Sequence, residues 1–357
     1  VDEIHMRFKH AMLEACNTGF QIHIQVKPSE FVNQYNIAQA IAAPVLAVSV
    51  NSPMLFAKRL WQETRVSLFQ QSVDTRKSSE HLRHQTARVN FGNDWLKNSI
   101  LEIYKEDIVR FRPMLGTKSE ENPQELLAKG EYPNLKALNV HNSTVYRWNR
   151  PCFGMKGDKP HLRIENRILP AGPTAVDEIA NTAFWLGLMK GMPLEFSDIT
   201  KVLRFDDVKS NFTAAARYGL GASFNWIKRK KLSAPELIEE LIPISKKGLE
   251  SVHVNTQDID EYLGIIEERN KSRQTGAEWA LHSFNLLSKK LTREETLSTI
   301  TEAYINKQKQ NIPVHNWTPA KVTKKSVWKP TSMLVEEFMH TDLFTVRKND
   351  ILELAID

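Results

Sequence analysis

The stretch HLRIENRILPAGPT, residues 161–174, decides the fold, and its first half alternates between polar and apolar side chains. Residues two apart in a strand point to the same face, so Arg163, Glu165 and Arg167 share one face. A carboxylate between two guanidiniums on a rigid strand is an arrangement that can hold a metal or a phosphate. A surface ladder of ion pairs on an antiparallel strand is the alternative interpretation.

A helix is expected directly after this strand. Pro170, Gly172 and Pro173 end the strand, and Thr174 followed by Asp177 is typical of a helix N-terminus. The apolar periodicity then predicts helices through most of the chain to about residue 310.

The chain before residue 161 carries weaker signals. Alternation predicts a second strand over 20–26, followed by a long, mostly apolar helix over 30–50. Residues 57–92 indicate irregular structure, and 141–150 indicate an extended segment. Strands in one part and helices in the other predict the α+β class.

Composition excludes several classes of protein. The chain has 357 residues, 41% hydrophobic and 25% charged, as in globular proteins of one large or two ordinary domains. The net charge of +6 is compatible with a polyanionic small molecule such as a nucleotide, and no basic–aromatic array indicates nucleic acid. The longest apolar run is too short to cross a bilayer, so no membrane partner is expected. Two cysteines, Cys16 and Cys152, and no signal peptide predict the cytoplasm.

Familiar site motifs are missing from the sequence. It has no zinc-ligand spacing, no glycine-rich phosphate loop and no serine-nucleophile motif, so nucleotide chemistry would have to use side chains on strands. Four further polar clusters remain. Each can also be explained without a functional role, as solvated surface, a strand edge or a helix cap. They are Gln21 with His23 and Gln25; Arg65 with Arg76; His141 and Thr144 leading to Arg147 and Arg150; and Asn211 with Arg217.

In their order and spacing these clusters resemble the glutamate–cysteine ligase family of the plant and proteobacterial type, and the related bacterial carboxylate–amine ligases. The resemblance runs from about residue 18 to about residue 248. The matching segments are the strand FQIHIQV, the helix ending in Asn51-Ser52-Pro53, the arginines 65 and 76, His141 with Thr144 and Arg150, the R-x-E-x-R strand with Pro173-Thr174, and Asn211 with the segment AARYGL.

The resemblance implies a fold and an activity. The R-x-E-x-R strand is similar to one in glutamine synthetases, which implies a glutamine-synthetase-like curved antiparallel sheet with packed helices. The implied activity is an ATP-dependent ligation of a carboxylate, the γ-carboxylate of glutamate, to an amine such as cysteine through an acyl phosphate. ATP and Mg²⁺ are the implied cofactors, the partners are small molecules, and a homodimer is compatible with the family.

The resemblance also implies roles for individual residues. It assigns Glu165, Arg167 and Arg163 to catalysis, and Glu165 with His23 to metal binding. The substrate-binding group comprises Arg65, Arg76, Arg150, His141 and Thr144. The nucleotide-binding group comprises Gln21, His23, Asn211 and Arg217.

Three departures qualify the resemblance. Pro170 stands where the family usually has an acidic residue, and His23 and Gln25 replace an asparagine and an aspartate. No strand with paired metal-binding glutamates precedes residue 1, so the chain is expected to be a piece of a longer protein or to have lost activity. The second case gives the alternative function, a catalytically weak, nucleotide-binding regulatory protein.

The C-terminal end predicts further parts. The ligase-like region is expected over 1–311, and the proline- and lysine-bearing stretch 312–332 reads as a linker. Residues 333–357 resemble the opening of a CBS domain, a module that senses adenosine nucleotides. The alternative, regulatory function would act through this module.

Overall fold

The computed structural model describes residues 2–6, 12–15, 17–74, 76, 86–116, 121–227 and 229–322. The end of the predicted linker and the predicted start of a CBS domain lie outside these residues.

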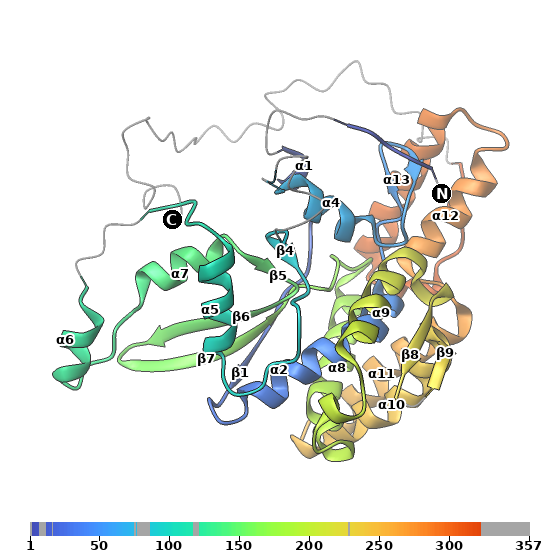
Figure 1. The fold of residues 1–357 in the computed structure, drawn as a ribbon. Coiled ribbons are helices and arrows are strands. Elements are labelled where there is room, and N and C mark those ends of the chain that lie inside the picture. The colour runs from blue at the N-terminus through green and yellow to red at the C-terminus, as the bar shows by residue number, and fades with distance from the viewer. Residues whose placement is uncertain are drawn as a thin grey trace.

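Among the described residues the main sheet has three strands, β1 (Ile22–Val26), β6 (Asn149–Lys156) and β7 (Lys159–Asn166). Their order is β1-β7-β6, and both pairs are antiparallel (Figure 1). The short strands form three pairs. These are β2 (Met54–Leu55) with β3 (Lys58–Arg59), β4 (Val89–Asn90) with β5 (Tyr146–Arg147), and β8 (Ser223–Trp226) with β9 (Arg229–Ser233).

Helices make up the rest of the regular structure. The first half of the chain holds α1 (Met12–Ala15), α2 (Phe31–Ala40), α3 (Ala42–Ser49), α4 (Thr64–Ser72), α5 (Leu101–Arg110), α6 (Pro123–Ala128) and α7 (Lys136–Ser143). The second half holds α8 (Ala175–Glu195), η1 (Ile199–Lys201), α9 (Phe205–Tyr218), η2 (Gly219–Gly221), α10 (Ala234–Ser251), α11 (Thr256–Ser272), α12 (Gly276–Leu287), α13 (Arg293–Gln310) and η3 (Val314–Asn316). The described chain is therefore of the mixed α+β kind with a largely helical C-terminal part. The glutamine-synthetase-like curvature of the sheet stays a prediction.

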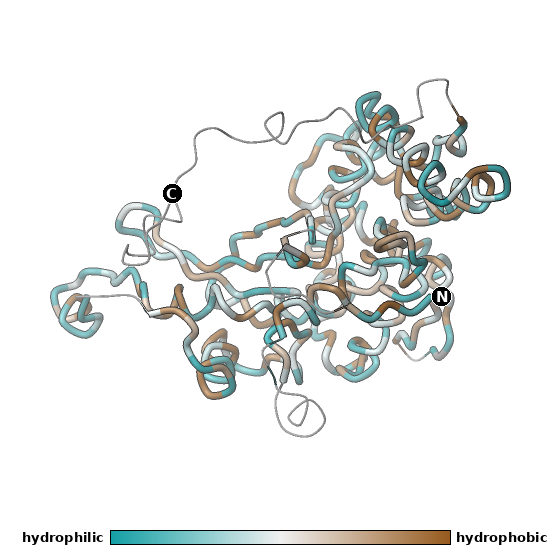
Figure 2. Tube along the Cα trace, turned by 90° about the horizontal axis from the view of Figure 1, so that it is seen from above, coloured by the Kyte–Doolittle hydropathy of each residue, from teal (hydrophilic) through white to brown (hydrophobic). Residues whose placement is uncertain are grey.

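The sheet and the C-terminal helices meet at a common core. Ile164 in the central strand is fully buried, and the Tyr35 hydroxyl of α2 donates to the Asn149 carbonyl of β6 at 3.1 Å. Every residue of α3 is buried, which explains why its sequence is apolar on all sides. In Figure 1 the sheet, α5 and α7 lie on the left and helices α8 to α13 on the right. Along the chain the tube of Figure 2 alternates between teal and brown, as amphipathic elements around a core require.

The long helix α8 approaches α10 so closely that only glycine fits at the crossing. A Cβ atom added at Gly248 would lie 1.9 Å from the carbonyl oxygen of Gly187, and one added at Gly191 would lie 2.0 Å from the Ile244 carbonyl oxygen. The start of α8 agrees with the sequence, because the Thr174 side chain accepts a hydrogen bond from the Asp177 backbone N–H. This fixes the direction in which the chain leaves the central strand.

The structure corrects three sequence expectations about elements. The predicted irregular stretch 57–92 contains the nine-residue helix α4. The predicted extended segment 141–150 begins inside α7, which ends at Ser143. The single helix predicted over 30–50 is divided at Ile41 into α2 and α3. In the first two cases tertiary packing outweighs a weak local pattern.

The stretch predicted as a linker is packed over its first part. Val314 and Trp317 are buried against a second core that includes Trp279 of α12 and Ile300 of α13. The Trp317 indole N–H donates to the Ile312 carbonyl at 2.7 Å. The residues up to Ala320 are therefore part of the helical region, and the domain boundary itself stays a prediction.

No helix in the described part of the chain combines the length and the apolar character needed to cross a membrane.

Candidate functional site

One face of the β1-β7-β6 sheet is polar, and strand register brings its residues together. Glu165 of β7 lies directly between His23 of β1 and Arg150 of β6. The next row places Arg163 between Gln25 and Cys152, and the row after that pairs His161 with Gly154. Residues opposite each other in neighbouring strands share a face, so these side chains line one surface. We call it the polar sheet face.

Glu165 is the centre of this face and is almost inaccessible to solvent, with 2% of its surface exposed. Its Oε2 lies 2.8 Å from Arg150 Nε, and its Oε1 lies 3.5 Å from Arg167 Nε. The Cys152 thiol donates to Oε2 at 3.3 Å. A buried carboxylate needs such partners, and the two arginines and the thiol supply them.

The surrounding guanidiniums are not fully paired. Arg163 Nε and Arg167 Nη1 are buried and have no hydrogen-bond partner among the described residues, and neither has the ring Nδ1 of His161. Arg167 also lies over the rings of Phe69 and Tyr146, at 5.8 and 5.6 Å from their centroids. Buried donors without acceptors are costly, and their natural partner is an anion that the protein binds.

The environment also changes the protonation of the face. Partial burial lowers the pKa of His23, against the attraction of Glu165, and the three arginines lower it further. Burial raises the pKa of the Cys152 thiol. Burial lowers the pKa of Arg167, whereas the pKa of Arg150 is raised because Glu165 and Cys152 outweigh the effect of burial. At neutral pH His23 is therefore uncharged and Cys152 is a thiol.

A glycine leaves space beside the unpaired donors. A Cβ atom on Gly154 would lie 2.9 Å from the His161 ring and 3.6 Å from Arg163 Nη2. Any larger residue would push these side chains aside, so the outer end of the polar sheet face depends on Gly154 being small.

Arg65 lies next to this face, and its guanidinium is paired with groups of the protein itself. Its Nη2 donates to the Ile168 carbonyl at 2.5 Å and its Nη1 to the Arg167 carbonyl at 3.4 Å, while its Nε pairs with the buried Glu63 at 3.3 Å. Burial lowers its pKa. Arg65 thus fixes the chain immediately after β7 and positions Arg167.

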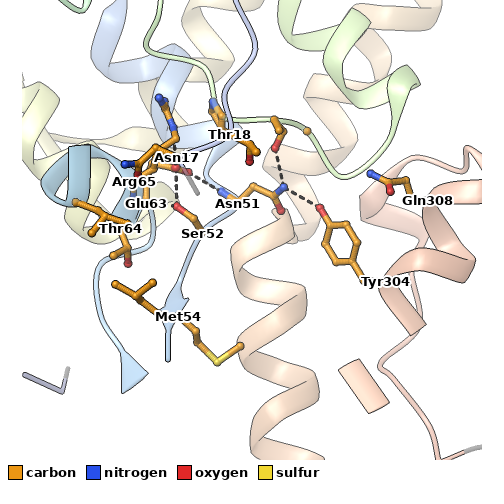
Figure 3. A pocket seen from close by; sticks show the side chains of 15 residues that line it. Asn17, Thr18, Asn51, Ser52, Met54, Glu63, Thr64, Arg65, Tyr304 and Gln308 are labelled. Atoms are coloured by element: carbon orange, nitrogen blue, oxygen red, sulfur yellow. Dashed lines mark hydrogen bonds and ion pairs between the residues drawn. The ribbon is translucent and has the colours of Figure 1, made fainter. Parts of the chain in front are cut away.

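Arg65 and Arg76, predicted as a substrate-binding pair, line different cavities. Figure 3 shows Arg65 with Glu63, Asn51 and Tyr304 at the wall of a cavity of about 310 Å³. Arg76 forms an ion pair with Asp74, with Nη2 2.6 Å from Oδ2, and lines a second cavity of about 330 Å³. Their common role as a clamp for a carboxylate stays a prediction.

His141 and Thr144 make contacts within the segment around α7. His141 Nε2 lies 2.8 Å from the Phe111 carbonyl oxygen, and the Thr144 hydroxyl donates to the His141 carbonyl at 2.9 Å. Thr144 also accepts from Arg88 Nη1 at 3.3 Å. These contacts hold the chain that leads into β6.

The residues predicted to bind a nucleotide are spread over several elements. The Asn211 side chain donates to the Asn225 carbonyl at 2.8 Å and accepts from its N–H at 3.0 Å, which joins α9 to β8. Arg217 lies over the Trp61 ring, 4.8 Å from its centroid, and Trp61 lines the second cavity. Gln21 is exposed, one residue before β1.

Sequence reasoning missed two residues of the polar sheet face, Cys152 and His161. The signal was present, because Cys152 follows Arg150 by two residues and His161 precedes Arg163 by two. The same spacing that placed Arg163, Glu165 and Arg167 on one face also places these side chains there.

The two predicted metal ligands do come together, with Cys152 as a third donor. The ligand atoms of His23, Cys152 and Glu165 lie within 4.8 Å of one another. Mg²⁺ prefers oxygen ligands in a regular octahedron. This group supplies one carboxylate, already paired with Arg150, together with a nitrogen and a sulfur, so it does not fit Mg²⁺.

The family model for glutamate–cysteine ligase family 2 (GCS2) matches residues 3–303. No curated protein matches the chain.

Proposed function

The chain belongs to glutamate–cysteine ligase family 2, and from this premise we propose that it is an ATP-dependent carboxylate–amine ligase whose active site is the polar sheet face. The acid is the γ-carboxylate of glutamate and the amine is one such as cysteine, as in the plant and proteobacterial type of the family. The region that carries the activity is residues 1–311.

One observation supports this location above all. The polar sheet face gathers Arg150, Arg163 and Arg167 around Glu165, and Arg163 Nε and Arg167 Nη1 are buried with no hydrogen-bond partner among the described residues. Three cations against one anion favour an anionic ligand, and a planar guanidinium suits a phosphate or a carboxylate. All the substrates of such a ligation except the reacting amine are anions.

The reaction has two steps in the proposed mechanism. An oxygen of the substrate carboxylate attacks the γ-phosphorus of ATP, the bond to the bridging oxygen breaks, and ADP leaves with an acyl phosphate formed. The lone pair of the amine then attacks the acyl carbon, the carbon–oxygen bond breaks, and inorganic phosphate leaves as the amide forms. The amine loses its proton to solvent in this second step.

The residues of this chain act mainly by charge and position. Arg163 and Arg167 donate to the phosphoryl oxygens, where negative charge is concentrated in the transition state. Glu165 holds Arg150 and Arg167 in orientation through its two oxygens. Arg65, bonded to the carbonyls of residues 167 and 168, keeps Arg167 in place.

Ligases of this family generally use ATP with Mg²⁺, which neutralises phosphate charge. The described residues of the polar sheet face offer Mg²⁺ one carboxylate only, that of Glu165. The residues from 333 onward, which resemble the start of a CBS domain, are proposed as a separate nucleotide-sensing part.

The test is release of ADP from ATP and glutamate with a panel of amines, in the wild type and in Glu165→Gln. We expect amine-dependent release in the wild type and a loss of about 100-fold in the variant, because the two arginines lose their anionic partner. Glu240→Gln is the matched control, since Glu240 pairs with Arg229 on the surface. No ADP release with any amine contradicts the ligase proposal, and full activity in Glu165→Gln contradicts the location of the site.

A further inference from the structure

His23, Cys152 and Glu165 form a group of possible metal ligands on the polar sheet face. Each residue comes from a different strand, and the antiparallel register sets them side by side without help from any loop. His23 is opposite Glu165 across β1 and β7, and Cys152 lies one row further along β6. Strands hold side chains more precisely than loops do, so the spacing of the three ligand atoms is a property of the sheet.

The chemistry of the three donors selects a class of metal. A thiolate, an imidazole and a carboxylate are the ligands that Zn²⁺ and similar ions of borderline softness prefer, usually in a tetrahedron. Three protein ligands with a fourth position left for water or another ligand is the arrangement of open zinc sites. His23 is exposed while Cys152 and Glu165 are buried, so the open position faces solvent beside the imidazole.

We infer that His23, Cys152 and Glu165 form a binding site for a thiophilic divalent ion of the Zn²⁺ class, distinct in chemistry from the Mg²⁺ expected for ATP. The ion takes the place of the Cys152 thiol proton, which leaves to solvent as the sulfur becomes a ligand. A thiolate and a carboxylate together balance the charge of the ion. Each carboxylate oxygen has two lone pairs, so Arg150 and Arg167 keep their contacts with Glu165 while the ion binds.

The inference reaches beyond the proposed ligase function, although both use Glu165. An ion held there occupies the centre of the polar sheet face, so Zn²⁺ is expected to inhibit the ligase reaction and excess Mg²⁺ is not expected to relieve the inhibition. Binding of the ion itself does not require the ligase activity, so the two proposals can fail separately.

The experiment uses Co²⁺, which replaces Zn²⁺ in such sites and gives a sulfur-to-cobalt absorption band when a thiolate is a ligand. The full chain carries Cys16→Ser, so that Cys152 is the sole cysteine. We expect the band to reach its limit at one Co²⁺ per chain, to disappear on addition of one equivalent of Zn²⁺, and to persist in excess Mg²⁺.

Variants distinguish the three ligands. Adding Cys152→Ser should abolish the band, and His23→Ala and Glu165→Gln should each weaken Co²⁺ binding by about tenfold or more. His282→Ala, a change at an exposed histidine of α12, is the matched control and should leave binding unchanged. Circular dichroism of each variant checks that it is folded. Absence of the band, its survival in the Cys152→Ser variant, its displacement by Mg²⁺, or unchanged affinity in His23→Ala overturns the inference.

Discussion

Two buried clusters of charge in this protein are built from similar residues. They differ in how many of their hydrogen-bond donors have a partner. In the first, Arg269 of α11 donates through Nη2 to Asp177 at 2.8 Å, and through Nη1 to Asn181 at 2.6 Å and to the Val48 carbonyl at 3.1 Å. Asp177 also accepts from the Thr174 hydroxyl at 2.8 Å. The second is the polar sheet face around Glu165.

The first cluster has almost no unmet donors. Asp177 is completely buried, it accepts a further hydrogen bond from the Val314 backbone N–H, and of the Arg269 guanidinium only Nε lacks a partner among the described residues. On the polar sheet face, by contrast, Arg163 and Arg167 each keep a donor that has no partner in the described part of the chain, and His23 is open to solvent. A buried network whose donors are almost all paired joins elements together, whereas one that keeps buried donors without partners beside an exposed histidine is suited to bind a ligand.

The largest expected effect is a loss of stability in the cluster around Arg269 and Asp177. Arg269→Ala leaves Asp177 buried without a cation, which should lower the free energy of unfolding by about 3–5 kcal/mol. Urea unfolding followed by circular dichroism measures this loss. Arg273→Ala, at an exposed position just after α11, is the control and should change stability by less than about 0.5 kcal/mol. Equal effects of the two changes would mean that the cluster does not join α11 to α8.

The next effect separates function from stability. Arg163→Lys keeps the positive charge of the polar sheet face but loses the planar fork, so kcat/KM for ATP should fall by about 100-fold. The free energy of unfolding should change by less than about 1 kcal/mol, because the buried Arg163 Nε has no hydrogen-bond partner to lose among the residues that the structure describes. Steady-state kinetics and urea unfolding on the same preparation give both values.

Arg229→Lys is the control for this change, since Arg229 pairs with Glu240 on the surface. Its kinetics should match those of the wild type. If Arg163→Lys instead destabilised the protein as strongly as Arg269→Ala and left kcat/KM unchanged, the contrast between the two clusters would be wrong.

The smallest expected effect concerns Tyr304 in the second half of the chain. Its hydroxyl accepts from Asn51 Nδ2 at 2.8 Å, and burial raises its pKa to about 12. Tyr304→Phe should therefore cost about 1 kcal/mol at neutral pH.

The same residue gives a dependence on pH with a definite sign. A tyrosine whose pKa is about 12 when folded and about 10 when unfolded contributes stability that is complete below pH ~10 and is lost as the pH rises through about 12. The difference in stability between the wild type and Tyr304→Phe should shrink and then change sign across this interval, because two pKa units correspond to about 2.7 kcal/mol. A constant difference would indicate that Tyr304 ionises equally in both states.

The sequence predicted the strands that carry His23 and Glu165, but it did not predict how the strands of the sheet pair with one another. Alternation in a strand is a local property, so the faces of Glu165 and His23 could be read from spacing alone. Register is not local, and nothing in the sequence states that Arg150 lies opposite Glu165 or that Cys152 comes within reach of it. The contact between Cys152 and Glu165 therefore appeared only when β6 was placed beside β7.

The burial of other residues could not be predicted because it depends on distant parts of the chain. Arg65 looked like a free loop arginine, but it is committed to the carbonyls of residues 167 and 168, about 100 positions away. Val314 and Trp317 stood in a stretch rich in proline and lysine, the pattern of a linker, yet they fill a core between α12 and α13. In both cases the partner is supplied by tertiary packing rather than by neighbours in sequence.

The most direct measurement of the central claim, that the polar sheet face transfers a phosphoryl group to a carboxylate, follows an oxygen atom. Glutamate labelled with ¹⁸O in its γ-carboxylate is incubated with ATP, an accepted amine and the full chain, and the phosphate released is analysed by mass spectrometry. We predict that one ¹⁸O atom passes to each phosphate in the wild type and in Glu240→Gln, and that this transfer is lost in a folded Glu165→Gln variant. Phosphate without ¹⁸O, or labelled phosphate formed equally by Glu165→Gln, would contradict the account.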